Sequence, residues 1–258
     1  MRLYGVTVDA LDPLSDIEDA LKRLAKRPYA RVVFDPQLSP QHYAQGVRRI
    51  HAVSGVMGEL VDSIGVAAMS TDDYAARTSA YLDALENDVD IWEIGNEING
   101  EWLGDAASVR TKILTSYQLV HARGKATALT LFYNEHCFAQ AENEMFRWAK
   151  ANVPDEMRDG LDYVLISYYE DNCKQPAPDW NGVFTRLAQL FPHSKVGFGE
   201  CGTTVEANKA AYVERYYQLD ITEPAYVGGY FWWYFRQDML PYTSPLWTVL
   251  NQSILASP

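Results

Sequence analysis

Residues 90–97 read DIWEIGNE, a short run in which apolar residues lead to an asparagine and a glutamate. Similar apolar, β-branched or aromatic runs recur along the chain, and a stretch with apolar residues at helical spacing follows each of them. The predicted strands are LYGVTVDA (3–10), ARVVFDP (30–36), VMGELVDS (56–63), DIWEIGNE (90–97), KATALTLFY (125–133), DYVLISYY (162–169), KVGFGE (195–200) and VGGYFWWYF (227–235). Most are apolar on both faces, as buried parallel strands are.

The eight predicted βα units fill the whole chain. No linker or break in composition interrupts them, so residues 1–258 are expected to form a single domain. Eight units with nothing left over favour an α/β fold of the closed (β/α)8 type, a TIM barrel, over an open doubly wound sheet. No G-x-G-x-x-G motif follows the first strand, which argues against the dinucleotide-binding form of the open sheet.

Capping sequences mark several predicted helix starts. Ser15 and Glu18 have the spacing of a capping box. Ser39-Pro40 and Ser244-Pro245 each place a capping serine before a first-turn proline. We therefore expect helices to begin at these points.

The composition argues against several classes of function. The chain has 22 Lys and Arg against 34 Asp and Glu, so its net charge of −12 would repel a phosphate backbone. No apolar stretch approaches the roughly 18 to 20 residues that cross a bilayer. We expect no nucleic-acid partner and no membrane span. The sequence fits a cytoplasmic protein, or a secreted or periplasmic one if an export signal has been removed.

The three cysteines do not indicate a metal site. Cys137, Cys173 and Cys201 are too widely spaced for a zinc ribbon and too few for a disulfide scaffold. All three lie just past predicted strand ends on one rim of the barrel. Cys137 and Cys173 either form a disulfide between adjacent loops or remain free thiols. The third cysteine is expected to be free unless it pairs with a second chain.

Two glutamates stand at the carboxyl ends of predicted strands, where barrel enzymes carry their active sites. Glu97 ends the fourth strand and Glu200 the seventh, and 103 residues separate them. That spacing suits opposite sides of one barrel mouth. Two carboxyl groups in different environments can protonate a departing glycosidic oxygen and stabilise an oxocarbenium ion. Their separation decides between retention and inversion of configuration.

Asn96-Glu97 at the end of the fourth strand, with Glu200 ending the seventh, resembles clan A of the retaining glycoside hydrolases. Parts of the chain resemble families 39, 53 and 10 of that clan. The resemblance implies that Glu97 is the acid/base, that Glu200 is the nucleophile, and that Asn96 binds the sugar 2-hydroxyl. We expect no metal and no organic cofactor, because protonation and attack by a carboxylate suffice for this reaction.

Further residues are candidates for substrate binding on the same resemblance. Arg31, in the second strand, would orient the nucleophile, unless it is a surface cap. Tyr169 in LISYYED, a stretch similar to family 53, would donate a hydrogen bond to the nucleophile, and alternation favours it over Tyr168. His136 in LFYNEHC, a stretch similar to family 10, would contact the sugar or the acid/base, unless it is an ordinary loop histidine.

Tryptophans are the candidate sugar platforms. Clan A barrels stack a sugar on a tryptophan of the eighth strand, which implies Trp233 and, as second choice, Trp232; one of two consecutive strand residues must face the helices. Trp102, in the loop after the fourth strand, is a candidate for a further subsite.

We therefore expect a glycoside hydrolase that cleaves β-linked sugars with retention. The short predicted loops favour an open groove and endo action on a polysaccharide or oligosaccharide. Glu135, in a second Asn-Glu pair, is a rival acid/base, but only two βα units separate it from Glu200. A glycan-binding barrel without catalysis is the alternative function. The sequence does not indicate an oligomeric state.

Overall fold

The computed structural model describes residues 2–173 and 178–258, and within them eight parallel strands pair in sequence order and close into a barrel. The strands are β1 (Leu3–Val8), β2 (Tyr29–Val33), β3 (Gly55–Glu59), β4 (Ile91–Gly95), β5 (Ala126–Phe132), β6 (Tyr163–Tyr168), β7 (Lys195–Cys201) and β8 (Gly228–Trp232). Each falls in or overlaps a predicted run, and the predicted (β/α)8 barrel is confirmed.

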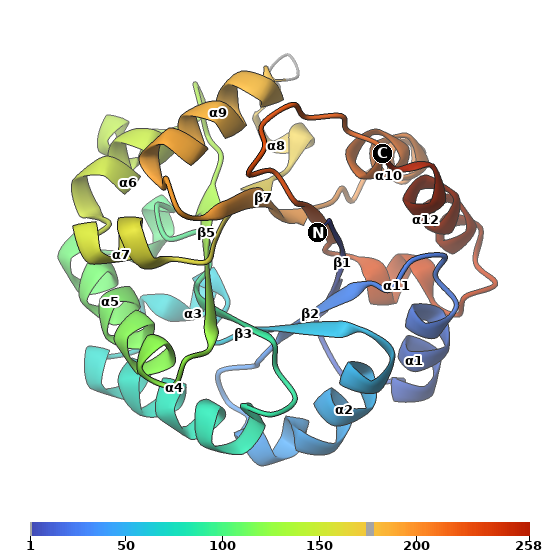
Figure 1. Cartoon of the computed structure of the whole chain (residues 1–258), viewed down its shortest axis with the longest axis horizontal. Coiled ribbons are helices and arrows are strands. Elements are labelled where there is room, and N and C mark those ends of the chain that lie inside the picture. The colour runs from blue at the N-terminus through green and yellow to red at the C-terminus, as the bar shows by residue number, and fades with distance from the viewer. Residues whose placement is uncertain (1, 174–177) are drawn as a thin grey trace.

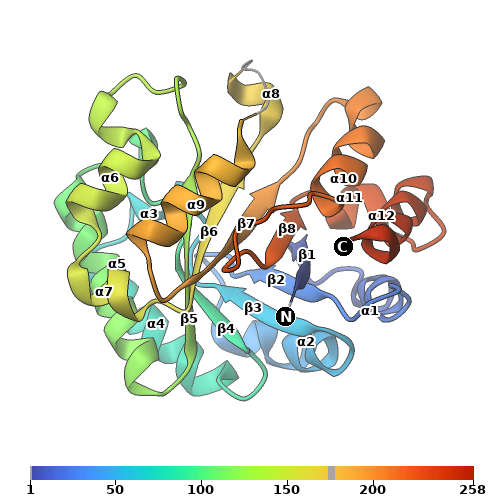
Figure 2. The same ribbon diagram turned by 45° about the horizontal axis from the view of Figure 1, so that its top comes forward.

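Helices surround the barrel on all sides (Figure 1). The α-helices are α1 (Leu14–Lys22), α2 (Pro40–Val53), α3 (Ser63–Val66), α4 (Thr71–Leu85), α5 (Ala106–Ala122), α6 (Met145–Asn152), α7 (Asp155–Gly160), α8 (Glu170–Cys173), α9 (Trp180–Leu190), α10 (Lys209–Tyr217), α11 (Phe235–Met239) and α12 (Pro245–Ala256). Short 3-10 helices are η1 (Glu101–Leu103), η2 (Ala141–Asn143) and η3 (Glu206–Asn208). In Figure 2, α8 lies beyond the end of β6.

The helix starts follow the predicted caps in part. Ser39 and Ser244 are the N-caps of α2 and α12, and the Ser244 hydroxyl accepts a hydrogen bond from the amide of Trp247. The capping-box prediction at Ser15 was wrong, because α1 begins at Leu14 with Pro13 as its N-cap. A proline there sets the backbone angle without a side-chain cap.

The barrel interior is built in two layers of different chemistry. Met57, Ile91, Ala128, Leu165 and Phe231 form an apolar cluster distinct from the main core between barrel and helices. Two residues further along β3 and β4, on the same face, stand Glu59 and Glu93, which are partners in the strand register. The apolar layer therefore closes the barrel below, and a buried polar layer supports its carboxyl end.

A bulge in β7 decides which way Glu200 points. Phe198 packs outward against the helix layer, near Trp180 and Phe184. Strict alternation would also turn Glu200 outward. The pairing with β6 instead jumps from Phe198–Ile166 to Glu200–Ser167, so Gly199 is an extra residue. As in other bulges, the extra residue re-aims the next side chain, here toward the barrel mouth.

Gly199→Ala is expected to destabilise the fold. A β-carbon at this position would lie 2.8 Å from both the Leu165 β-carbon and the Thr130 Oγ1 atom, inside the barrel. Overpacking of this kind costs about 1 to 3 kcal/mol of unfolding free energy. Urea unfolding followed by circular dichroism measures the effect, and an unchanged midpoint would show that the bulge tolerates a side chain.

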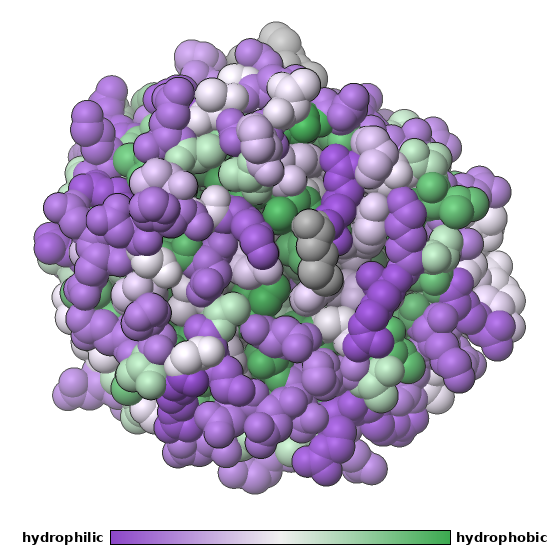
Figure 3. Space-filling view, viewed as in Figure 1, coloured by the Kyte–Doolittle hydropathy of each residue, from purple (hydrophilic) through white to green (hydrophobic). Residues whose placement is uncertain are grey.

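The face of the molecule seen in Figure 3 is mostly hydrophilic, and its apolar side chains form small separate patches. Among the residues that the structure describes, no helix is both long and apolar enough to cross a membrane.

Candidate active site

A cavity of about 330 Å³ opens at the carboxyl ends of the strands. Its walls come from β7, from the end of β5 and from the segments that follow β3, β4, β6 and β8. The lining residues are Asp62, Ser63, Ile64, Asn96, Glu97, Trp102, Phe132, Tyr169, Asn172, Glu200 and Trp233. Residues far apart in sequence therefore meet at one mouth, as the active-site residues of such barrels do.

Glu97 lies just past the end of β4 and is held by two serines. Ser167 donates a hydrogen bond to Glu97 Oε1 at 2.6 Å, and Ser63 donates one to Oε2 at 2.9 Å. Glu97 has a φ of 48°, a left-handed conformation that is uncommon for residues other than glycine. Local strain of this kind is concentrated at functional sites. Burial raises the pKa of Glu97, and the two serine hydrogen bonds oppose that rise.

Glu200 is bound by a cation as well as by a hydroxyl. Its Oε2 atom accepts a hydrogen bond from Arg31 Nη1 at 2.9 Å, and its Oε1 atom accepts one from the Tyr169 hydroxyl. Burial raises the pKa of Glu200 to about 8, while Arg31 and Tyr169 act in the opposite direction. Burial also raises the pKa of Tyr169 well above its usual value, so this phenol keeps its proton and remains a donor.

Arg31 is fully buried and ties the site to the polar layer below it. Its Nε atom is 2.6 Å from Glu93 Oε2, and its Nη2 atom is 3.1 Å from Glu59 Oε2. Neither oxygen of Glu59 has a hydrogen-bond partner in the described part of the chain, so its contact with Arg31 is close but poorly aligned. Burial raises the pKa of Glu59 well above its ordinary value, against the opposing effect of Arg31. Burial therefore favours the neutral form of Glu59, and the hydrogen bonds of the guanidinium go to Glu93 and Glu200.

The two carboxyl groups of the cavity influence each other. A negative charge on Glu97 raises the pKa of Glu200, so the pair releases its protons in two linked steps. When the pair holds one proton, the contact with Arg31 favours the charge on Glu200. Glu97 touches only neutral hydroxyls, which stabilise a negative charge less than a guanidinium does. The cavity thus holds two carboxyl groups in different environments, one beside a cation and one beside two hydroxyls.

The raised pKa of Glu200 predicts how stability depends on pH. A carboxyl group with a higher pKa in the folded chain binds its proton more tightly when folded, so its contribution is complete below the ordinary pKa of 4.5 and is lost as the pH rises through about 8. We expect the urea midpoint of the wild type to fall over this range more than that of Glu200→Gln. Equal slopes in the two proteins would contradict the assignment.

Three other predicted residues line the cavity, namely Asn96, Trp233 and Trp102. The Oδ1 atom of Asn96 is buried without a hydrogen-bond partner among the described residues, so a ligand hydroxyl could complete it. The Trp233 ring centroid lies 5.7 Å from the Arg31 guanidinium carbon. Trp102 is 43% exposed and stands at the edge.

Two predicted substrate-binding residues lie away from the cavity lining. Trp232 is fully buried in the main core, and its indole nitrogen donates to Asp238 in α11, so it faces the helices. His136 is mostly exposed on the loop after β5, 3.9 Å from Glu135. Glu135 itself accepts a hydrogen bond from Tyr133, whose ring packs outward against Trp180. The rival glutamate therefore does not line the cavity.

Several lining and supporting residues were missed by the sequence analysis, namely Asp62, Ser63, Ile64, Ser167, Glu59 and Glu93. The signal for Glu59 and Glu93 was present, because each is a charged residue at the inward position of an otherwise apolar strand. Ser63 and Ser167 carry no such signal, since serines are common at strand ends.

The cysteine predictions have different outcomes. Cys201 is a free, buried thiol on β7. The predicted bridge between Cys137 and Cys173 depends on the Cys173 side chain, which lies outside the described residues. No cluster of three or more His, Cys, Asp or Glu side chains suited to a metal ion is found in residues 2–173 and 178–258.

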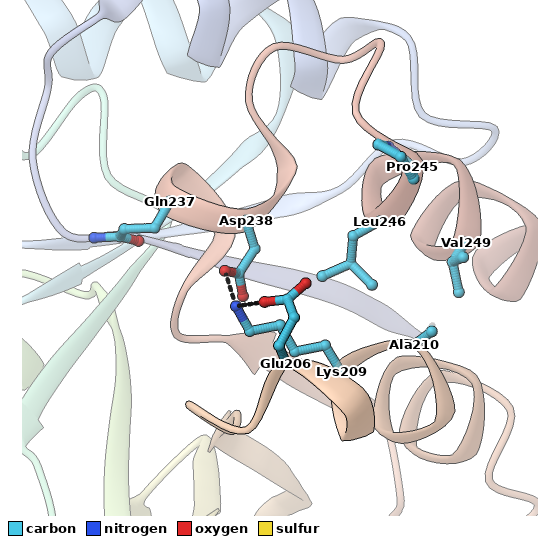
Figure 4. Close-up of a pocket in the computed structure, with 8 residues that line it drawn as sticks. All are labelled: Glu206, Lys209, Ala210, Gln237, Asp238, Pro245, Leu246 and Val249. Carbon is cyan, nitrogen blue, oxygen red and sulfur yellow. Dashed lines mark hydrogen bonds and ion pairs between the residues drawn. The ribbon is translucent and has the colours of Figure 1, made fainter.

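A second pocket, of about 350 Å³, lies beside α10, α11 and α12 (Figure 4). The Lys209 amino group there is 2.7 Å from Glu206 Oε2 and 2.7 Å from Asp238 Oδ1. Asp238 also accepts the hydrogen bond of the Trp232 indole. The charged side chains of this pocket are therefore paired with one another. Asp238 also links α11 to β8 through its hydrogen bond with Trp232.

Comparison with known proteins supports the fold. No protein-family model and no curated protein sequence matches the chain. Saccharomyces cerevisiae Gas2p in complex with laminaritriose and laminaritetraose superposes with a TM-score of 0.62 and 13% identity, over 100% of this chain and 65% of that one. A GH18 chitinase from Pseudoalteromonas aurantia has a TM-score of 0.61 and 13% identity, over 98% of this chain and 100% of that one. The chain spans slightly less than two thirds of the yeast protein's length. At these identities the likeness establishes the (β/α)8 fold.

Proposed function

We propose that residues 1–258 form a single catalytic barrel that hydrolyses β-glycosidic bonds with retention of configuration. One observation carries the proposal: two buried carboxyl groups line one cavity, and only Glu200 is in contact with a cation. Two carboxyl groups whose environments differ in this way suit the separate roles of nucleophile and acid.

The proposed reaction has two displacements. In the first, Glu97 gives its proton to the glycosidic oxygen while a Glu200 oxygen attacks the anomeric carbon, and the leaving group departs from a covalent glycosyl-enzyme. In the second, Glu97 removes a proton from water, which attacks the same carbon and releases Glu200. The unpartnered Asn96 Oδ1 atom accepts a hydrogen bond from the sugar 2-hydroxyl. Two inversions at one carbon give net retention.

The similar structures support glycan chemistry without selecting the mechanism. Gas2p was solved with laminari-oligosaccharides, and the other neighbour is a chitinase. Family 18 enzymes use substrate assistance in place of a carboxylate nucleophile. The fold is therefore compatible with both mechanisms, and the Arg31-paired carboxylate favours direct attack by Glu200.

The edge of the cavity favours an oligosaccharide or polysaccharide as substrate. Ile64 is 82% exposed and Trp102 43% exposed, and both line the cavity next to Glu97. The leaving group must sit beside the acid, so this apolar edge would stack a sugar ring on the leaving-group side. We propose endo action, which requires sugars bound on both sides of the cleaved bond.

A screen of the purified protein against β-glucan, xylan, galactan, mannan and bacterial exopolysaccharides tests the function. Early products followed by proton NMR should show the β-anomer first, and labelled oligosaccharides should be cut at internal bonds. Immediate release of the α-anomer from a β-linked substrate would refute retention. Binding of a glycan without any turnover would favour the non-catalytic barrel.

A further inference from the structure

Three side chains, from the segments that follow β3 and β4, form a chain of hydrogen bonds that ends on Glu97. The indole nitrogen of Trp102 donates to Ser63 Oγ at 3.1 Å, and Ser63 Oγ donates to Glu97 Oε2 at 2.9 Å. Trp102 belongs to η1 after β4, and Ser63 is the first residue of α3 after β3. Ser63 and Glu97 are both buried.

The donor chemistry of these groups gives the chain a direction. An indole nitrogen can only donate, whereas a hydroxyl has one proton to give and two lone pairs to accept with. Trp102 fills one lone pair of the Ser63 oxygen, and in the described part of the chain the acceptor of the Ser63 proton is Glu97 Oε2. The hydroxyl is not occupied by helix capping, since the Asp62 side chain accepts from the Ile64 amide at the start of α3.

The other oxygen of Glu97 has a different neighbour. Ser167, in β6, is within 2.6 Å of Oε1, and no further side chain is described that fixes the rotation of its hydroxyl. A proton on Glu97 Oε2 would point at the proton of the Ser63 hydroxyl. The Ser63 hydroxyl would then have to turn away and give up its hydrogen bond to Oε2. A proton on Oε1 requires only that the Ser167 hydroxyl turn, so that it accepts instead of donating.

We propose that Trp102 and Ser63 are positioning residues for the acid/base. The oriented Ser63 hydroxyl keeps Oε2 as an acceptor, so the proton that Glu97 delivers is carried on Oε1. The assignment of Glu97 as acid/base rests on the proposed function. The hydrogen-bond chain from Trp102 through Ser63 to Glu97, called the relay below, is a property of the free protein. The relay can therefore be tested without a substrate.

Titration of the Glu97 carboxyl carbon by NMR, in protein with isotope-labelled glutamate, measures the effect of the relay. The resonance is assigned by its loss in Glu97→Gln. Removing a donor to a carboxylate disfavours the charged form, so Ser63→Ala should raise the pKa of Glu97. Trp102→Phe, which keeps a ring but removes the N–H group, should raise it less. Ser63→Thr keeps the hydroxyl and should restore the wild-type titration.

The double variant separates a relay from two independent effects. If Trp102 acts through Ser63, then Trp102→Phe should have no further effect in the Ser63→Ala background. An equal shift in both backgrounds, an unshifted titration in Ser63→Ala or Trp102→Phe, or failure of Ser63→Thr to restore it would overturn the proposal. Neutron diffraction at acidic pH should place the deuterium on Oε1, and density on Oε2 would equally overturn it.

These outcomes are distinct from failure of the proposed function. If the protein cleaves no glycan but its variants show the expected titrations, the relay is supported and the proposed hydrolase function is refuted. If the protein cleaves β-glycans but the titration of Glu97 is unaltered in the variants, the hydrolase function is supported and the relay is refuted. In an active enzyme, Ser63→Ala should also move the alkaline limb of the kcat/KM profile upward, because that limb reports the acid.

Discussion

Glu200→Gln is expected to lower kcat by at least about a thousandfold on any β-glycan that the wild type cleaves, because the amide cannot form the glycosyl-enzyme. The change is nearly isosteric, and the amide can still contact Arg31 and Tyr169. Binding of the glycan, measured by calorimetry, should therefore persist. Loss of turnover with retained binding is the signature of a group that acts on the transition state.

Glu97→Ala should behave differently because a general acid is needed only by a poor leaving group. For a sugar leaving group we expect a loss of about 10² to 10⁴ in rate, which is the usual contribution of proton transfer. A nitrophenolate departs without a proton, so an aryl β-glycoside should form the glycosyl-enzyme almost as fast as in the wild type. A burst of nitrophenol followed by slow turnover is the expected time course.

Glu135→Gln is the matched control for both substitutions. It removes a glutamate that also follows an asparagine at a strand end but does not line the cavity. Its activity should equal that of the wild type. Wild-type turnover in Glu200→Gln, or a large loss in Glu135→Gln, would show that the wrong carboxyl groups have been assigned.

The barrel could be predicted because its strands are short, apolar on both faces and regularly interrupted by helical stretches. The direction of one side chain also followed from alternation. Tyr168 packs outward against Trp180, and Tyr169 reaches Glu200, as the strand periodicity predicted. Where a strand is regular, the alternation of side chains along the sequence is enough to predict which face a residue occupies.

Strand alternation gives the wrong direction for a side chain where the backbone is irregular. Counting from Phe198 places Glu200 on the outer face, and only the extra residue Gly199 returns it to the cavity. Its placement at the mouth was predicted from its position at a strand end and its spacing from Glu97, whereas strand alternation would have turned the side chain away. The serine partners of Glu97 could not be predicted either, because only the closed barrel brings Ser63 of α3 and Ser167 of β6 together at this carboxyl group.

Arg31→Met should be the most destabilising of these changes. Arg31 is completely buried and is in contact with Glu59, Glu93 and Glu200. Removing one partner of a buried ion pair costs about 3 to 5 kcal/mol, because the remaining charges have no compensation. Methionine keeps much of the apolar stem, so the loss reports the charge more than the volume. Urea unfolding at neutral pH measures it.

Glu59→Gln provides the contrast, since it tests whether Glu59 contributes a charge to the same cluster. Burial raises the pKa of Glu59 and favours its neutral form, so the variant with an amide of similar shape should unfold at nearly the wild-type urea concentration. The penalty of Arg31→Met should also shrink as the pH falls, because protonation removes the negative charges that need the guanidinium. A large cost for Glu59→Gln would mean that Glu59 is ionised, and Arg31 would then be shared among three carboxylates. Sharing among three carboxylates would weaken the interaction of Arg31 with Glu200. The reason for assigning the negative charge of the Glu97–Glu200 pair to Glu200 would then be weakened as well.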